Sequence, residues 1–249
     1  MARKKLKWSD MRPSEKRDHV IYLIGQILKW LFVGSMCIFT LYPVVYTLLG
    51  SFKTNAELTL GGNFLPENWQ FNNYVYAFQK LDFGKYFLNS VVLALLTVVF
   101  TLITSSMAAY VISRQDFVGK KLISTAYLLS MFISVGSVAL YPLYTLMSRL
   151  GLTKNMVGLA LMLTGGQAAN IFMISGFING VPKDLDEAAT IDGAGPFRIF
   201  WQIIVPAIKP ILGVIALFAF RQAWNEFVTA QVFTMANPGL KTLSVAVAN

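Results

Sequence analysis

The sequence has 249 residues, of which 55% are hydrophobic and only 13% are charged. Soluble domains carry about 25% charged residues, so this composition excludes an ordinary soluble domain and predicts an all-α polytopic membrane protein. The net charge of +9 indicates membrane topology and not nucleic-acid binding, because the Lys and Arg residues cluster between apolar runs. With one cysteine and one histidine, we expect no disulfide framework, no metal site and no catalytic residue.

Five apolar stretches of the sequence reach the length of about 20 residues that crosses a hydrocarbon core of about 30 Å. In chain order they are residues 20–49, 87–112, 122–147, 156–178 and 211–233. Lys29 interrupts the first stretch, so we expect its leading part to lie at the membrane interface. This stretch is too long for a signal peptide, and no small-residue cleavage site follows it. We therefore predict five transmembrane helices.

Positive charge is distributed unevenly between the two sides of these spans. Segments 1–19, 113–121 and 180–209 hold 13 Lys and Arg residues, and the connections on the other side hold 6 over a greater length. Lys and Arg in short flanking segments resist translocation. We therefore expect the basic segment 1–19 and the loop 180–209 in the cytoplasm, and the loop 50–86 and the last residues outside.

The predicted outer loop, residues 50–86, is rich in aromatic residues. They are Phe52, Phe64, Trp69, Phe71, Tyr74, Tyr76, Phe78, Phe83 and Tyr86. Aromatic residues at this density form an interfacial belt or a small packed cap. A docking surface for an extracellular protein is the alternative interpretation.

The loop 180–209 is too structured for a simple connection between two spans. Asp184 has the character of an N-cap, with Glu187 three residues later as in a capping box. Gly193 and Gly195 are typical of a helix C-terminus. A second helix is expected from Pro196, with an apolar face at a spacing of three to four residues: Phe197, Phe200, Trp201 and Ile204. Two short helices joined at a glycine elbow predict a docking element.

Arg221 is the most informative residue of the fifth stretch. At about 1.5 Å per residue from Pro210, it lies roughly 17 Å along the helix, near the bilayer middle. A charge at that depth marks a functional or paired site. Glu226 is about 140° around the helix, which disfavours an internal ion pair. Two interpretations stay open: Arg221, Gln222 and Asn225 line a translocation path and bind a sugar, even an acidic one, or Arg221 pairs with an acidic residue or helix end of a neighbouring subunit.

A family resemblance rests on Glu187-Ala188-Ala189, Gly193, Ile203, Val205 and Pro206. This pattern resembles the "EAA" loop of permease subunits of bacterial ABC importers, which usually have Leu where this chain has Val205. Three further segments are similar to the carbohydrate-uptake branch, especially the shorter permease of the maltose-transporter type: "FLPENWQFNNYVYAF" at 64–78, "AAYVISR" at 108–114 and "AWNEF" at 223–227. The resemblance covers essentially the whole chain.

The resemblance implies that residues 1–249 form one type I ABC importer transmembrane domain in the plasma membrane of a bacterium or archaeon. Its partners would be a second related permease, two ATPase subunits, an extracytoplasmic solute-binding protein, a sugar or oligosaccharide substrate and lipid. Because the sequence lacks GxxxxGK[ST], we expect no cofactor in this chain, with ATP and Mg²⁺ bound by the partner ATPase. The implied ATPase-docking residues are Glu187, Ala188, Ala189, Asp192, Gly193, Ala194 and Arg198.

The chain departs from the family pattern in its number of spans, and other solutes and functions stay open. The family implies a sixth span and a cytoplasmic C-terminus. Either that span lies beyond Asn249 or the family topology does not hold for this chain, and we expect the former. Within the importer class, a polyol phosphate or a peptide is the alternative solute. A secondary transporter would need its own coupling-ion site and usually an internal repeat, and no repeat is visible. A membrane scaffold could carry a docking loop without moving a solute.

Overall fold

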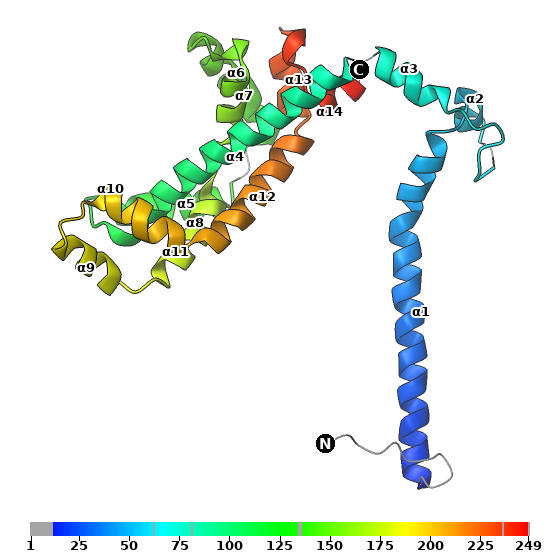
Figure 1. Cartoon of the computed structure of the whole chain (residues 1–249), viewed down its shortest axis with the longest axis horizontal. Helices are drawn as coiled ribbons and strands as arrows, with labels where there is room; N and C mark the ends of the chain where they lie inside the picture. The colour runs from blue at the N-terminus through cyan, green and yellow to red at the C-terminus, as the bar shows by residue number, and fades with distance from the viewer. Residues whose placement is uncertain (1–11, 62, 81, 134–135, 236, 249) are drawn as a thin grey trace. The chain divides into compact units, whose positions relative to one another are not determined.

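The computed structural model describes residues 12–61, 63–80, 82–133, 136–235 and 237–248. All regular elements in these ranges are helices, as expected for an all-α membrane protein. The chain divides into two compact units, Met1–Lys80 and Leu81–Asn249. Figure 1 shows the helices in a colour gradient from blue at the N-terminus to red at the C-terminus.

The first unit is dominated by one long helix, α1, which runs from Pro13 to Gly50 over 38 residues. At about 1.5 Å per residue it is about 57 Å long, so it exceeds a hydrocarbon core of about 30 Å. Lys29 interrupts the apolar pattern, and a change of chain direction was possible there. The structure shows instead that α1 continues through Lys29 as one helix. Within the first unit, the large apolar side chains of its span, His19–Gly50, are exposed.

A small packed cap follows α1 and contains the short helices α2, Asn55–Thr59, and α3, Asn72–Lys80. The ring of Phe52 lies 5.2–5.4 Å from three other rings, those of Trp69, Phe71 and Tyr74. Asn73 Nδ2 donates to the carbonyls of Ser51 and Lys53 at 3.0 Å. The cap interpretation of the aromatic loop is confirmed for these four rings.

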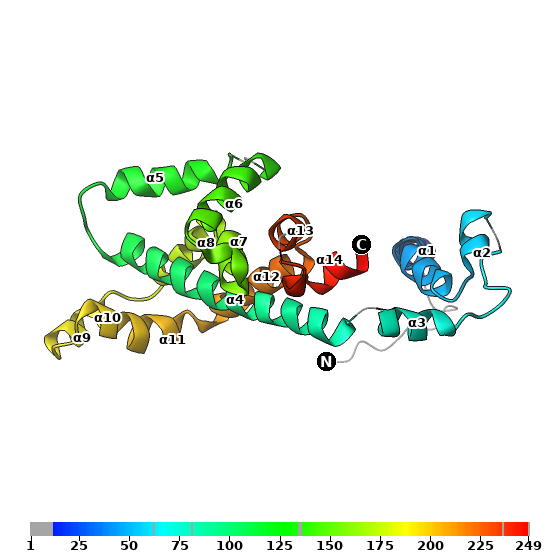
Figure 2. The same ribbon diagram turned by 90° about the horizontal axis from the view of Figure 1, so that it is seen from above.

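The second unit is built around α4, Phe83–Arg114. Helices α7, α8 and α12 pack along it, and Figure 2 shows α4 running beneath this group. The buried face of α4 is mostly small or hydroxyl-bearing, including Ala94, Thr97, Thr101 and Ser105. Small side chains allow neighbouring helices to approach closely, and Tyr110 is the large aromatic residue on the buried face of α4.

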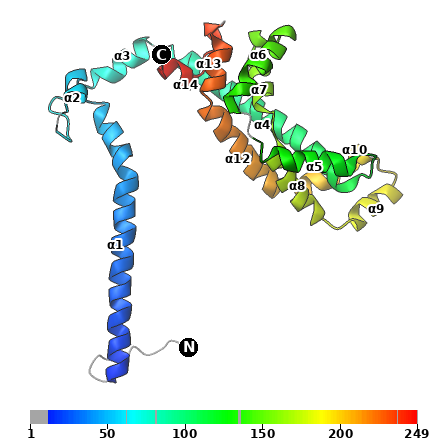
Figure 3. The same ribbon diagram turned by 180° about the vertical axis from the view of Figure 1, so that it is seen from behind.

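The remaining helices of the second unit are short. In chain order they are α5 Lys120–Ser130, η2 Gly136–Ala139, α6 Leu140–Arg149, η3 Leu152–Lys154, α7 Met156–Leu163, α8 Ala168–Asn179, α9 Asp184–Ile191, α10 Pro196–Ile199, η4 Phe200–Ile204, α11 Val205–Ala207, α12 Lys209–Asn225, α13 Val228–Thr234, η5 Pro238–Leu240 and α14 Leu243–Ala248. The C-terminal part is tied to the start of α4, where Asn89 Nδ2 donates to the carbonyls of Gly239 and Lys241 at 3.0 and 2.9 Å. Figure 3 shows α13 and α14 beside this end of α4.

Among the residues that the structure describes, only the first two predicted spans are single helices long enough to cross a membrane, namely His19–Gly50 and Phe83–Arg114. The fourth is a bent pair, α7 and α8, whose axes differ by 67°. Between them, Gly166 has a φ of +70°, a conformation that favours glycine. The fifth predicted span is interrupted, because α12 ends at Asn225 and α13 begins at Val228.

The third predicted span was wrong as a continuous helix. Residues 122–147 form α5, a break and α6 instead. Gly136 is left-handed in this break, with a φ of +55°. Pro142 lies in the first turn of α6, where its missing N–H removes no helical hydrogen bond. The proline therefore fits the start of a new helix better than the middle of a long one.

Candidate functional site

The loop between α8 and α12 forms the predicted pair of short helices. The first, α9, begins at Asp184, and its N-cap is Lys183, which makes no side-chain cap hydrogen bond. The predicted capping box was therefore wrong, because the helix begins one residue earlier than that motif requires. Asp184, Asp186 and Glu187 lie in its first turn instead, where their charges complement the helix dipole.

The glycine elbow after α9 is a Schellman motif. Gly193 has a φ of +81°, and its N–H donates to the carbonyl of Thr190 at 3.0 Å. The N–H of Ala194 donates to the carbonyl of Ala189 at 2.9 Å. This pair of bonds satisfies carbonyls at the end of the helix and requires a left-handed residue at Gly193. The predicted helix end at Gly193 is confirmed.

The second short helix begins at Pro196 as predicted and continues through a π-helical turn, Phe200–Ile204. Its predicted apolar face was only half right. Phe200 and Ile204 are buried, whereas Phe197 and Trp201 are exposed. The buried row of this segment continues into α12 and joins the core of the unit: Ile199, Phe200, Ile204, Ile208, Ile211 and Ile215. The π-helical turn changes which side chains face the core, because it adds a residue to the turn.

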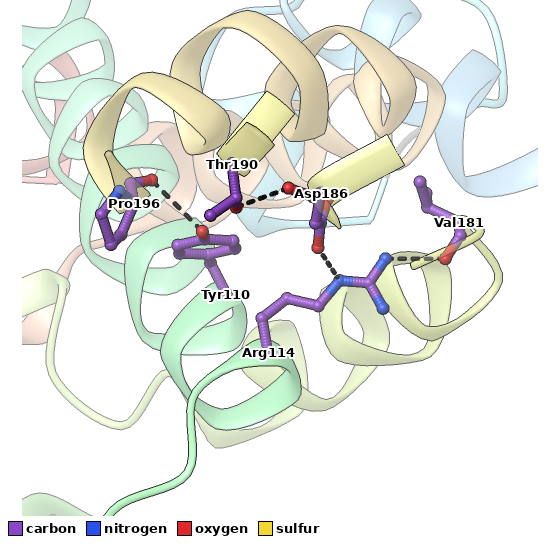
Figure 4. A network of polar contacts seen from close by, with 6 residues as sticks. All are labelled: Tyr110, Arg114, Val181, Asp186, Thr190 and Pro196. Carbon is purple, nitrogen blue, oxygen red and sulfur yellow. Dashed lines mark hydrogen bonds and ion pairs between the residues drawn. The ribbon is translucent and has the colours of Figure 1, made fainter. Parts of the chain in front are cut away.

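An ion pair joins α9 to the end of α4 (Figure 4). Arg114 Nε lies 2.8 Å from Asp186 Oδ2, and the Arg114 side chain is only 4% exposed. Its Nη2 also donates to the carbonyl of Val181 at 2.6 Å. One guanidinium therefore holds both the segment before α9 and the first turn of α9.

A second contact holds α10 against the same end of α4. The hydroxyl of Tyr110 donates to the carbonyl of Pro196 at 3.2 Å, and the Tyr110 ring lies 5.3 Å from that of Phe200. Tyr110 and Arg114 are four residues apart, so they share one face of α4. Neither contact was predicted from the sequence. Arg114 was the residue that could have indicated them, because it is a charge at the end of an otherwise uncharged span.

The predicted docking residues lie on α9, on the glycine elbow and at the start of the following helix. Glu187, Ala188, Asp192, Gly193 and Arg198 are exposed, and Ala189 and Ala194 are half-buried. A hollow of about 200 Å³ between α9 and the following helix is lined in part by Ala189, Asp192, Ala194 and Arg198. The structure thus brings these predicted residues together on one protrusion.

Two apolar side chains on α9 were not predicted as part of the site. Ile191 is 86% exposed and Leu185 is 48% exposed. Large apolar side chains that project from a charged helix are typical of a protein-docking surface. Leu185 and Ile191 lie on either side of Glu187 and Ala188 in the sequence, and this proximity could have identified them as part of the site.

The second predicted group lies on α12. Arg221, Gln222 and Asn225 are exposed and, with Phe218, line a hollow of about 510 Å³. Asn225 Nδ2 donates to the carbonyl of Arg221 at 2.8 Å. Glu226 accepts a hydrogen bond from the N–H of Thr229 at 2.8 Å, so it caps α13 and is not directed into this group.

Comparison with known proteins identifies the chain's relatives. Residues 102–249 match the family model described as binding-protein-dependent transport system inner membrane component. The chain is 33% identical over 191 residues to a diacetylchitobiose uptake system permease protein of Streptomyces coelicolor, a match that covers 76% of this chain and 63% of that protein. It is 33% identical over 225 residues to a trehalose transport system permease protein of Mycobacterium tuberculosis, covering 90% of this chain and 79% of that one.

A solved structure shares the fold. It is a bacterial ABC transporter involved in the import of the acidic polysaccharide alginate, matched with a TM-score of 0.75 and 26% sequence identity. The match covers 89% of this chain and 78% of the other.

Proposed function

We propose a function for this chain from one premise: it belongs to the family of binding-protein-dependent transport system inner membrane components. The chain is a permease subunit of an ABC importer of the carbohydrate type. Its relatives are named as permeases for diacetylchitobiose, trehalose and galactooligosaccharides. A saccharide or oligosaccharide is accordingly the solute that this subunit moves across the membrane.

The permease works with other subunits that supply energy and solute. A second related permease completes the translocation path, two ATPase subunits bind ATP and Mg²⁺, and an extracytoplasmic binding protein delivers the saccharide. The sequence of this chain contains no GxxxxGK[ST] segment, the pattern that cradles nucleotide phosphates. The N-terminus, the loop 180–209 and the ATPase lie on the cytoplasmic side, which the excess of Lys and Arg there supports.

The observation that carries the proposed coupling role is the attachment of α9 to α4. Glu187, Ala188, Ile191 and Leu185 project outward from a helix whose inner side is fixed by Arg114. Ala188 lets a partner approach closely, and the Glu187 carboxylate pairs with a basic residue of the ATPase cleft. When ATP binding closes the ATPase pair, α9 moves with it and displaces α4. This displacement changes which side of the membrane reaches the solute site, as alternating access requires.

Two other functions stay as alternatives. A non-sugar solute would use the same coupling, so only a solute assay separates it from a saccharide. A scaffold would dock a partner through α9 without stimulating ATP hydrolysis. The saccharide importer is favoured over both because several relatives with 30–33% identity are named as saccharide permeases.

The decisive experiment is to purify the chain with the subunits it assembles with and to measure ATPase activity in lipid. Glu187→Lys is expected to uncouple or release the ATPase, because it places a positive charge against a basic cleft. Glu67→Lys is the matched control, since it makes the same charge change at an exposed position in the cap. Absence of a copurifying ATPase, with unchanged activity in Glu187→Lys, would replace the importer with the scaffold.

A further inference from the structure

Two helix breaks of the second unit lie against each other. α7 ends at Leu163, and α12 ends at Asn225. Gln222 Nε2 donates to the carbonyl of Leu163 at 3.4 Å, which places the last turn of α12 beside the end of α7. Irregular backbone at membrane depth is tolerated only where protein buries it or where it lines a water-filled cavity. Interrupted helices that meet within the membrane are also where transporters bind solutes.

A hollow lies along one face of α12 and includes Gln222, the residue that contacts the end of α7. Its lining residues, Phe218, Arg221, Gln222 and Asn225, follow the spacing i, i+3, i+4 and i+7 and therefore share one face of the helix. The neighbouring face is buried in the core of the unit. One aromatic ring beside three polar side chains matches the chemistry of a sugar, which presents a C–H face and many hydroxyl groups.

Arg221 is the charged residue of that lining. In the described part of the chain, no carboxylate forms an ion pair with its guanidinium. A charge in the membrane is costly unless it is paired or faces a cavity. Guanidinium groups bind carboxylates in a bidentate geometry that lysine does not reproduce. The hollow thus offers a cation that matches an anion on the solute.

We infer that this face of α12 binds the transported solute, and that the solute is an acidic saccharide whose carboxylate pairs with Arg221. Phe218 supplies the apolar surface for the sugar ring, and Gln222 supplies hydrogen bonds to hydroxyl groups. The inference rests on the proposed saccharide importer and specifies the charge of its solute. An acidic side chain of the second permease is the competing partner of Arg221, and the experiment is designed to expose it.

The test uses the assembled transporter with its binding protein in liposomes. Uptake is measured for three matched pairs of disaccharides, made from galacturonate and galactose, glucuronate and glucose, and mannuronate and mannose. Arg221→Gln is compared with Arg221→Lys, which keeps the charge but loses the bidentate geometry. Lys121→Gln is the control, because it removes one exposed positive charge from α5, away from the hollow. Complex yield and ATPase activity without solute are recorded for every variant.

We expect wild-type uptake of at least one acidic disaccharide in preference to its neutral counterpart. Arg221→Gln should reduce that uptake by about 10- to 100-fold, the effect of losing one charge-assisted hydrogen-bonded pair, with intermediate uptake in Arg221→Lys. Uptake restricted to neutral disaccharides, or an equal loss for both members of each pair, would overturn the inference. Loss of complex yield in Arg221→Gln without a selective effect would assign Arg221 to the second permease. The proposed coupling to an ATPase is tested separately, by copurification of the ATPase and by the activity of Glu187→Lys, and these measurements need no solute.

Discussion

Arg114 and Asp186 are 72 positions apart in the sequence, yet Arg114 Nε lies 2.8 Å from Asp186 Oδ2. The pair joins the last turn of the central helix α4 to the first turn of α9. Because Arg114 is almost fully buried, solvent screens this attraction less than it screens a surface ion pair. The pair therefore attaches α9 to α4 in addition to the covalent chain.

Removal of either partner of this pair should weaken coupling between solute transport and ATP hydrolysis. Arg114→Gln leaves the largely buried Asp186 carboxylate without its cation, which costs about 3 kcal/mol of folding free energy. We expect less stimulation of ATPase activity by solute-loaded binding protein, with the basal activity of the complex retained. The measurement is the ratio of stimulated to basal activity, together with the melting temperature of the complex.

Asp186→Asn and the double variant complete a thermodynamic cycle for this pair. If the two residues act through each other, the double variant should be less impaired than the sum of the single variants. If the effects of Arg114→Gln and Asp186→Asn are additive in both readouts, each residue acts alone. The ion pair would then make no contribution to coupling.

Gly193→Ala should disrupt the docking element itself. The φ of +81° at Gly193 is left-handed, and a side chain there costs about 1–2 kcal/mol. We expect the Schellman motif to rearrange, α9 to change direction, and less ATPase to copurify with the membrane-inserted permease. Gly195→Ala is the matched control, because Gly195 has a φ of −75° and open space around it. Equal ATPase recovery for the two variants would contradict the requirement for a left-handed residue.

Gly158→Ala should reduce the stability of the second unit. A Cβ on Gly158 would lie 2.0 Å from the carbonyl oxygen of Leu152, so η3 or α7 has to shift. The N–H of Gly158 also donates to Asn155 Oδ1 at 3.0 Å, and a shift weakens this helix cap. A loss of at least 2 kcal/mol, roughly the scale of core overpacking, should appear as reduced yield and a lower melting temperature. Gly176→Ala serves as the comparison, since a Cβ there meets no atom within 4 Å.

The cap after α1 should respond to acid through Glu57. The N–H of Thr54 donates to the Glu57 carboxylate at 2.8 Å and the N–H of Glu67 donates at 3.1 Å, and these bonds lower the pKa of Glu57 below its ordinary value. Because the folded pKa is depressed, the contact stabilises the cap at a pH above the unfolded pKa of about 4.3. The stabilisation is lost as the pH falls through the folded pKa.

Amide hydrogen exchange over residues 51–70 measures this effect. At pH 7, Glu57→Gln should exchange faster than the wild type, because the amide side chain is a weaker acceptor than a carboxylate. As the pH falls through the lowered folded pKa of Glu57, the two proteins should converge, since a protonated Glu57 resembles Gln. A difference that does not shrink on acidification would argue against Glu57 as the acid-sensitive group.

The sequence alone determined the class of this protein and the two short helices of the loop 180–209. Apolar runs such as residues 87–112 predict membrane helices because the bilayer sets the length of a span. Gly193 and Pro196 predict a helix end and a helix start because each residue restricts the backbone locally. These signals act within a few neighbouring residues, so they need no knowledge of the fold.

The tertiary structure decided what local signals cannot encode. Residues 122–147 are apolar enough for a span, but α5 ends at Ser130 and a new helix, α6, begins at Leu140, just before Pro142. The pairing of Arg114 with Asp186 and the contact of Gln222 with Leu163 join distant segments. Hydropathy records only the preference of each side chain for lipid or water, whereas these contacts arise from how helices pack against one another. Packing is a property of the whole unit, and it alone places the docking helix on α4 and the two helix breaks side by side.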